Sequence, residues 1–161
     1  MSKMIIRQMR HGDIKEVSVL YKKVFDHANV GEKWTNKNSL RIWEYWSSRK
    51  PNIAYVVVID KKIVGGFIGF IVPWWNGNHL RDCEIFVDPR NQNRGLGAML
   101  LKTALNKSLS DYKASYIIGM TFNGKKFPLS WYESIGFEKG GPLTMVWGNP
   151  KKILRKINNN D

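Results

Sequence analysis

The sequence has a single cysteine and no long apolar run. Cys83 alone cannot form an internal disulfide, which suits a reducing compartment. The longest apolar stretch, residues 63–75, is broken by Gly65 and Pro73 and falls short of the roughly 18–20 residues needed to cross a bilayer. The N-terminal residues lack the apolar core of a signal peptide. These absences predict a soluble, cytoplasmic protein with no membrane partner.

Acidic residues are also few, so charge of one sign dominates. Asp and Glu number 13 against 26 Lys and Arg, which gives a net charge of +13. This balance favours polyanionic partners such as nucleic acid, but it also fits a basic, well-solvated surface. The basic residues are spread along the chain, with no basic amphipathic helix and no aromatic RNA-binding motif. A nucleic-acid partner is therefore the less favoured alternative.

The chain shows neither an internal repeat nor a metal-ligand spacing. Its three histidines are not spaced as ligands, so no metal site is expected. At 161 residues the chain fits one domain, which we place at residues 1–148. Residues 149–161 are predicted to form a basic, polar tail that frays.

Apolar periodicity predicts alternating helices and strands. Helical spacing begins at Asp13 and is predicted again at residues 30–48, after residue 97 and at residues 128–135. Apolar, β-branched runs predict strands at residues 4–9, 54–59, 63–72, 83–87, 115–121 and 144–147. Residues 73–79 are expected to form a loop. This order predicts an α/β (α+β) domain of three layers, in which helices cover both faces of a mixed sheet of about six to seven strands.

One glycine-rich segment joins a predicted strand to a predicted helix. It reads Gln92-Asn93-Arg94-Gly95-Leu96-Gly97. The start of a helix offers unpaired backbone N–H groups and the positive end of the helix dipole, which suit a phosphate or pyrophosphate. The segment lacks the Lys-Ser/Thr pair of a P-loop and has only the G-x-G of the dinucleotide fingerprint. On these residues alone, a glycine turn without a ligand stays open.

The longer run around this segment resembles motif A of the GNAT superfamily of N-acetyltransferases. That motif reads Q/R-x-x-G-x-G/A after a strand that ends in Val-x-Pro, and Gln92, Gly95 and Gly97 fill its positions after Val87-Asp88-Pro89. A second run, Trp131-Tyr132-Glu133-Ser134-Ile135-Gly136-Phe137, is similar to the family's motif B. The resemblance covers nearly the whole chain, from Met4 to Trp147, and implies a GNAT-like fold.

The resemblance implies that the chain binds acetyl-CoA and transfers its acetyl group to an amine. Backbone N–H groups of the glycine loop would bind the pyrophosphate, and the strand before the loop would pair with the pantetheine arm. Asn123 is the counterpart of a family asparagine that bonds the pantetheine, although its spacing to Tyr132 is longer than usual. The implied cofactor-binding residues are Ile85, Phe86, Val87, Gln92, Asn93, Arg94, Gly95, Leu96, Gly97, Ala98 and Asn123.

Two side chains are candidates for proton transfer. Tyr132 stands where the family commonly has the acid that protonates the leaving thiolate, and otherwise it is a core aromatic of a short helix. Glu84 is the candidate general base, and strand alternation predicts that it shares a face with Asp82. A chain of waters could replace it, and an exposed or ion-paired carboxylate is the plainer interpretation.

Tryptophans are concentrated in the segments that build the acceptor site in this family. Trp34, Trp74 and Trp75 are the candidate substrate-binding residues, whereas Trp43 and Trp46 are expected in the core. The favoured acceptor is a primary amine of a small molecule or peptide. The alternatives are an RNA-directed enzyme that acetylates aminoacyl-tRNA, a nucleic-acid-binding protein, and a coenzyme-A-binding regulatory domain without turnover. Dimers are common in the family, so a homodimer is left open.

Overall fold

The structure is a computed structural model, and it describes residues 3–122, 126–140 and 148–158. The chain divides into two compact units, Met1–Met120 and Thr121–Asp161, and each is described by itself. Within the described ranges, no helix has the length and apolar character that a membrane span requires.

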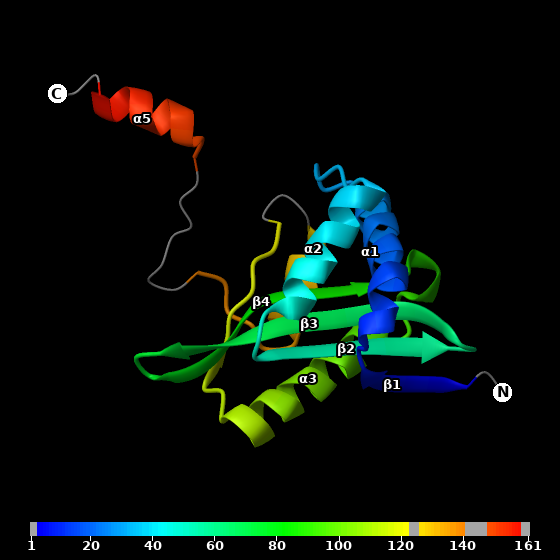
Figure 1. The fold of residues 1–161 in the computed structure, drawn as a ribbon. Helices are drawn as coiled ribbons and strands as arrows, with labels where there is room; N and C mark the ends of the chain where they lie inside the picture. The colour runs from blue at the N-terminus through cyan, green and yellow to red at the C-terminus, as the bar shows by residue number, and fades with distance from the viewer. Residues whose placement is uncertain (1–2, 123–125, 141–147, 159–161) are drawn as a thin grey trace. The chain divides into compact units, whose positions relative to one another are not determined.

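The first unit is a five-stranded sheet with helices on both faces (Figure 1). The strands lie in the order β1-β2-β3-β4-β5, with β1 to β4 antiparallel and β5 parallel to β4. Helices α1 and α2 cover one face and α3 covers the other. The bounds are β1 Met4–Gln8, α1 Ile14–Ala28, α2 Asn36–Ser48, β2 Asn52–Ile59, β3 Lys62–Trp74, β4 Gly77–Val87, α3 Leu96–Tyr112 and β5 Tyr116–Ile117.

Strand β3 is buried along most of its length because both of its faces are covered. Residues 63–71 are all buried, which explains why this run is apolar or glycine rather than alternating. On the α1/α2 face the core is aromatic, and the ring of Tyr21 meets those of Trp43 and Phe86 edge-on at 5.6 and 5.5 Å. The other face packs against the apolar side of α3, formed by Leu96, Leu100, Leu101 and Ala104.

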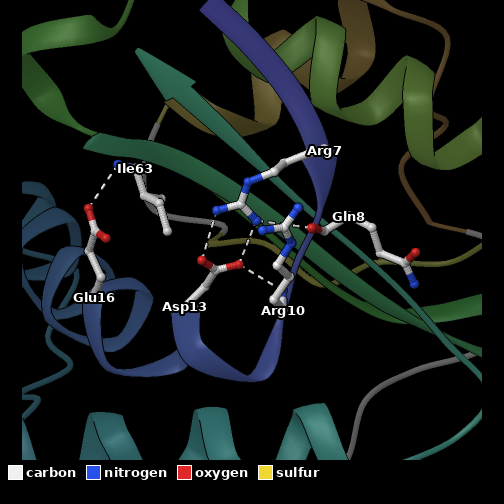
Figure 2. Close-up of polar contacts among 6 residues, drawn as sticks. All are labelled: Arg7, Gln8, Arg10, Asp13, Glu16 and Ile63. Carbon is white, nitrogen blue, oxygen red and sulfur yellow. Dashed lines mark hydrogen bonds and ion pairs between the residues drawn. The ribbon is translucent and has the colours of Figure 1, made fainter. Parts of the chain in front are cut away.

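The link from β1 to α1 is fixed by Asp13 (Figure 2). Its carboxylate accepts hydrogen bonds from the Arg7 guanidinium at 2.6 and 2.8 Å and from the Arg10 backbone N–H at 2.7 Å. The bond from Arg7 lowers the pKa of Asp13. Further along α1, Glu16 accepts a hydrogen bond from the backbone N–H of Ile63 at 2.8 Å. These contacts tie α1 to β1 and to the start of β3.

Strand β4 contains a β-bulge at its centre. Where β3 advances by one residue, Gly69, β4 advances by two, Asp82 and Cys83. Asp82 has a φ of +51°, in the left-handed region, and a Cβ at Gly69 would lie 2.9 Å from Cys83 Sγ. Only glycine therefore fits opposite the bulge. Because of the extra residue, Glu84 lies on the same face of the sheet as Arg81.

The second unit contains two described helices, α4 (Lys126–Ser134) and α5 (Pro150–Asn158). Within α4, Phe127 has a non-helical conformation, so the regular part of the helix begins at Pro128. Gly136 follows with a φ of +100°, and the backbone N–H of Phe137 bonds to the carbonyl of Tyr132 at 3.0 Å. This is a glycine-terminated helix end.

The secondary structure differs from the sequence-based prediction at four places. The described residues form five strands, fewer than the predicted six to seven, and the predicted strand 144–147 lies outside them. β5 spans only Tyr116–Ile117, because the sheet opens beyond it. The predicted loop at residues 73–79 is instead the tight end of the β3–β4 hairpin. Residues 150–158 form a basic amphipathic helix rather than a frayed tail, with Ile153, Leu154 and Ile157 as its apolar residues.

Candidate active site

The C-terminal half of β4 is open along one edge. The parallel ladder with β5 contains only the pairs His79–Tyr116 and Leu80–Ile117 among the described residues. On the other edge, the backbone N–H of Asp88 bonds to the carbonyl of Val64 at 2.8 Å. Hydrogen-bonded pairs alternate along an antiparallel ladder. This bond therefore shows which residues of β4 direct their backbone N–H and carbonyl groups toward β3.

The alternation directs the backbone groups of Ile85 and Val87 toward the open edge. Glu84 and Phe86 are the residues whose backbones bond to β3, in register with Ile68 and Gly66. An extended ligand arm laid along the open edge could therefore pair with Ile85 and Val87 as an added strand does. Phe86 was also a candidate cofactor contact, but its ring is 4% exposed and lies in the core.

The loop after β4 is held by its own side chains. Asp88 accepts a hydrogen bond from the backbone N–H of Arg90 at 3.0 Å, and Gln92 Nε2 donates to the carbonyl of Val87 at 3.0 Å. The side chain of Gln92 thus ties the loop to the C-terminal end of β4. Arg94 donates to Asn91 Oδ1 at 2.9 Å, so both ends of the loop are tethered.

Two positive φ angles turn the chain into α3. Asn93 has φ +59° and Gly95, the N-cap of α3, has φ +74°. A Cβ at Gly95 would meet nothing within 4 Å, so the backbone conformation, and not crowding by protein atoms, requires glycine here. The left-handed turn reverses the chain between the loop after β4 and the start of α3.

The first N–H groups of α3 form a site for an anion. The first bond within the helix runs from the Met99 N–H to the Gly95 carbonyl at 3.0 Å. The N–H groups of Leu96, Gly97 and Ala98 therefore have no acceptor within the helix. Together with the positive end of the helix dipole, they suit a phosphate or pyrophosphate. The side chain of Leu96 itself is buried, so its contribution is the backbone alone.

Charge near the loop is partly neutralised. Lys23 of α1 pairs with Asp88 at 2.7 Å. Burial alone would raise the pKa of Asp88, but the hydrogen bonds from Lys23 and from the Arg90 backbone outweigh it and lower that pKa. The carboxylate of Asp88 is therefore ionised and occupied, so it does not repel an anion as a free carboxylate would.

Glu84 lies on the α1/α2 face next to the aromatic core. Tyr21 Oη donates a hydrogen bond to Glu84 Oε2 at 3.3 Å. Burial raises the pKa of Glu84 to about 7, although the Tyr21 hydrogen bond lowers it, and the negative charge of Glu32 raises it further. Desolvation by burial also raises the pKa of Tyr21, so the phenol stays protonated. A carboxyl that titrates near neutral pH can accept a proton there.

The segment between α1 and α2 approaches the same region. Trp34 Nε1 donates to Glu32 Oε2 at 2.8 Å, and the Trp34 ring lies 5.4 Å from that of Tyr21. Glu84, Tyr21, Trp34 and Glu32 are thus linked by contacts from three separate segments. Tyr21 and Glu32 are absent from the sequence-based candidates. The helical spacing of α1 marks Tyr21 only as a core residue, and no local pattern marks Glu32.

The other predicted site residues lie elsewhere. Trp74 and Trp75 lie at the tip of the β3–β4 hairpin, and Trp74 follows Ile68, the partner of Glu84, by six residues along β3. At about 3.3 Å per residue, this separates Trp74 from Glu84 by about 20 Å of strand. Asp82, which strand alternation predicts on the same face as Glu84, lies in the bulge and pairs with Arg49 at 3.5 Å.

The last two candidates belong to the second part of the chain. Asn123 lies outside the described residues. Tyr132 lies in α4, with its ring 5.0 Å from that of Trp131 and 5.2 Å from that of Phe137. The aromatic pair and the following Gly136-Phe137 therefore form one small cluster. The role of Tyr132 as an acid stays a prediction.

Comparison with known proteins identifies relatives of this fold. The sequence profile of the acetyltransferase (GNAT) domain matches residues 50–139. No curated protein sequence matches the chain. An aminoglycoside N-acetyltransferase solved in complex with CoA is 17% identical with a TM-score of 0.71, and the match covers 92% of this chain and 96% of that one.

Two further solved structures are similar over the same extent. A ribosomal-protein-alanine N-acetyltransferase from Brucella melitensis biovar Abortus 2308 is 14% identical with a TM-score of 0.71, and the match covers 90% of this chain and 99% of that chain. A transcriptional regulator from Bacillus halodurans C-125 is 17% identical with a TM-score of 0.71, covering 90% and 100%. At such identities the likeness establishes the fold, and these names show that the fold serves more than one function.

Proposed function

Because the chain belongs to the GNAT acetyltransferase family, we propose that it transfers the acetyl group of acetyl-CoA to a primary amine of a small molecule or peptide. One arrangement carries this proposal. The open edge of β4 leads at one end to the helix start at Leu96, Gly97 and Ala98, and it lies on the strand that carries Glu84.

The donor fits the residues at the open edge. The three N–H groups at the start of α3 would bind the pyrophosphate, and Ile85 and Val87 would pair with the pantetheine arm. No carboxylate of the loop is left free to oppose the phosphates, because Asp88 is paired with Lys23. The resemblance to the family gives the N–H of Val87 as the donor to the developing oxyanion, and the ladder directs that group to the open edge.

Glu84 supplies the base in this proposal. The amine nitrogen forms a bond to the thioester carbonyl carbon, and the carbon–sulfur bond breaks. Glu84 receives the proton that the amine loses, and Tyr132 gives its proton to the leaving thiolate, as the family resemblance implies. With a pKa near 7, Glu84 is ionised in a substantial fraction of molecules at neutral pH while remaining basic enough to take a proton.

The acceptor would enter between Glu84 and the segment that carries Trp34. Glu32 and Trp34 lie on that segment, and their hydrogen bond at 2.8 Å fixes one relative to the other. A carboxylate beside an indole suits a protonated amine, through charge and through the face of the ring. Trp34 is therefore kept as a substrate-binding residue, whereas Trp74 and Trp75 are not proposed for this role.

A thiol-release assay with acetyl-CoA tests the proposal. The panel contains small primary amines, peptides with a free amino end, and aminoacyl-tRNA. We expect thiol release that depends on one of the first two classes, together with a thermal shift of the protein by acetyl-CoA alone. A thermal shift without any acceptor-dependent turnover would support a regulatory coenzyme-A-binding domain instead. The absence of a shift at high acetyl-CoA concentration would refute the donor assignment.

A further inference from the structure

A row of arginine and aromatic side chains continues along the α1/α2 face of the sheet beyond these helices. The β3–β4 hairpin projects past both α1 and α2 in the first unit (Figure 1). The row, which we call the arginine–aromatic stripe, consists of Arg49, Phe70, Arg81, Trp74, His79 and Tyr116. No single predicted element or sequence motif groups these residues, because they come from the end of α2 and from three different strands.

The stripe is continuous through direct contacts. The Arg49 guanidinium carbon lies 4.0 Å from the centre of the Phe70 ring, and Phe70 pairs across the strands with Arg81. The Arg81 guanidinium carbon lies 4.9 Å from the centre of the Trp74 ring. Both guanidinium groups are therefore held over rings, at distances typical of cation–π contacts.

His79 joins the remaining rings of the stripe. Its own ring is 4% exposed and lies 6.1 Å from Trp74 and 5.2 Å from Tyr116. Its Nε2 lies 2.7 Å from Asn76 Oδ1, a hydrogen bond that orients the imidazole. The buried histidine thus holds an indole and a phenol at fixed positions on either side of it.

The outer rings are exposed to solvent. Trp74 is 47% exposed and Tyr116 58% exposed, and Trp75, next to Trp74 at the hairpin tip, is 87% exposed. Rings that are exposed but held in place by neighbours lose little freedom when they bind a partner. Trp74 and Tyr116 are in this state, and together with the neighbouring Trp75 they make an interaction surface at the hairpin end of the first unit.

We propose that the arginine–aromatic stripe binds single-stranded nucleic acid. Unpaired bases stack on aromatic rings and on guanidinium planes, and the stripe offers the exposed rings of Trp74 and Tyr116 beside the guanidinium of Arg81. The net charge of +13 attracts a polyanion, and Asp82, an acidic residue beside the stripe, is already paired with Arg49. A duplex fits less well, because its bases are not available for stacking. The proposal goes beyond acetyl transfer and does not depend on it.

Charge favours nucleic acid over a protein partner. Arginine and aromatic residues are also enriched at protein–protein interfaces, so the kind of partner is decided here by net charge. Here two guanidinium groups lie among the rings of the surface, on a chain with twice as many basic as acidic residues. A second copy of the chain would bring the same positive charge to the contact, and its association is therefore disfavoured.

Binding of a labelled oligoadenylate, followed by fluorescence anisotropy, tests the aromatic part of the stripe and the neighbouring Trp75. We expect Trp74→Ala and Trp75→Ala each to weaken binding about 5- to 150-fold, since stacking on a ring contributes roughly 1–3 kcal/mol per base. Leu109→Ala is the matched control, because it removes an exposed apolar side chain from α3, on the other face of the sheet. This control should leave the affinity unchanged.

The arginines are tested by the dependence of affinity on salt. Between about 50 and 200 mM salt, Arg81→Gln should reduce the slope of log affinity against log salt by up to about 0.7 if it meets one phosphate. It should also weaken binding at every salt concentration, because it removes a stacked plane. Lys102→Gln, an exposed lysine of α3, is the control for a simple loss of charge.

Three results would overturn the proposal. They are no binding of oligoadenylate at low salt, equal losses in Arg81→Gln and Lys102→Gln, and a Trp74→Ala protein that binds like the wild type. A change of molecular mass on Trp75→Ala substitution, without oligonucleotide, would assign the surface to self-association instead. Circular dichroism melting of each variant verifies that the fold is retained. Thiol release measured in parallel keeps the outcome separate from that of the acetyl-transfer proposal.

Discussion

The two sides of the C-terminal half of β4 use different parts of the polypeptide. On the open edge, the groups offered to a ligand are the backbone N–H and carbonyl of Ile85, the N–H of Val87 and the N–H groups at the start of α3. On the α1/α2 face, they are side chains, and Glu84 depends on the hydroxyl of Tyr21. The open edge tolerates changes of side chain but depends on the backbone conformation. The α1/α2 face depends on the identity of its side chains, so substitutions can separate the two sides.

The largest expected effect is on the side-chain face. Glu84→Gln keeps the shape of the side chain but removes its ability to take a proton, so we expect kcat/KM to fall by about 10²- to 10⁴-fold. The affinity for acetyl-CoA, measured by calorimetry, should stay within about twofold of the wild type. Glu44→Gln, on the exposed side of α2, is the control. A Glu84→Gln enzyme with normal turnover would transfer the role of base to water.

Tyr132→Phe should have the next largest effect. If the phenol protonates the thiolate, its loss lowers kcat by about ten- to a thousand-fold with little change in acetyl-CoA affinity. Steady-state kinetics with saturating acceptor, beside a thermal shift with acetyl-CoA, separates the two quantities. Unchanged kcat would leave Tyr132 as a structural member of its cluster with Trp131 and Phe137.

On the backbone side, Gly95→Ala tests conformation with the smallest change of side chain. A residue with a Cβ at φ +74° costs about 1–2 kcal/mol, so we expect acetyl-CoA to bind about 5- to 30-fold more weakly if the loop relaxes instead. If the loop keeps its shape, the same free energy lowers the melting temperature by a few degrees. Gly119→Ala is the control, because φ there is not positive and nothing lies within 4 Å of the added Cβ. Loss of neither affinity nor stability would contradict the conformational explanation.

The smallest effect is a shift of the pH profile. Glu84 must be ionised to accept a proton, so wild-type kcat/KM should rise with pH up to its pKa of about 7 and then level off. The Tyr21 hydrogen bond lowers that pKa, and Tyr21→Phe should therefore move the rising limb to higher pH by about 0.5–1 unit. Activity at pH 8.5 should be nearly unchanged, which separates this effect from misfolding. A shift to lower pH would mean that the hydroxyl does not stabilise the carboxylate.

The backbone side could be predicted from the sequence because its determinants are local. The spacing of Gln92, Gly95 and Gly97 after Val87-Asp88-Pro89 records one strand end, one left-handed turn and one helix start. Each of these depends on residues a few positions apart. The same holds for β2, for β3 and for the start of α1, which were predicted close to their observed bounds.

The side-chain face could not be predicted in this way, because its members meet only in the folded chain. Glu84, Tyr21 and Glu32 come from a strand, a helix and a connection, and their proximity depends on how α1 docks on the sheet. Alternation along β4 could not predict that Arg81 shares a face with Glu84, because the extra residue of the bulge shifts the period. Trp74 and Trp75 were predicted at the acceptor site because residues 73–79 were expected to form a loop that helps to build this site in the family.

The bulge in β4 also orders charge along the sheet. Because of the extra residue, the face that carries Glu84 carries Arg81 three positions earlier, where strict alternation would have placed them on opposite faces. The face is therefore positive toward the β3–β4 hairpin and acidic toward the C-terminal end of β4, and Arg81 and Glu84 lie within about 10 Å of each other along the strand. Such a gradient gives the surface a direction, and a molecule with charges of both signs has lower energy along it in one orientation than in the reverse.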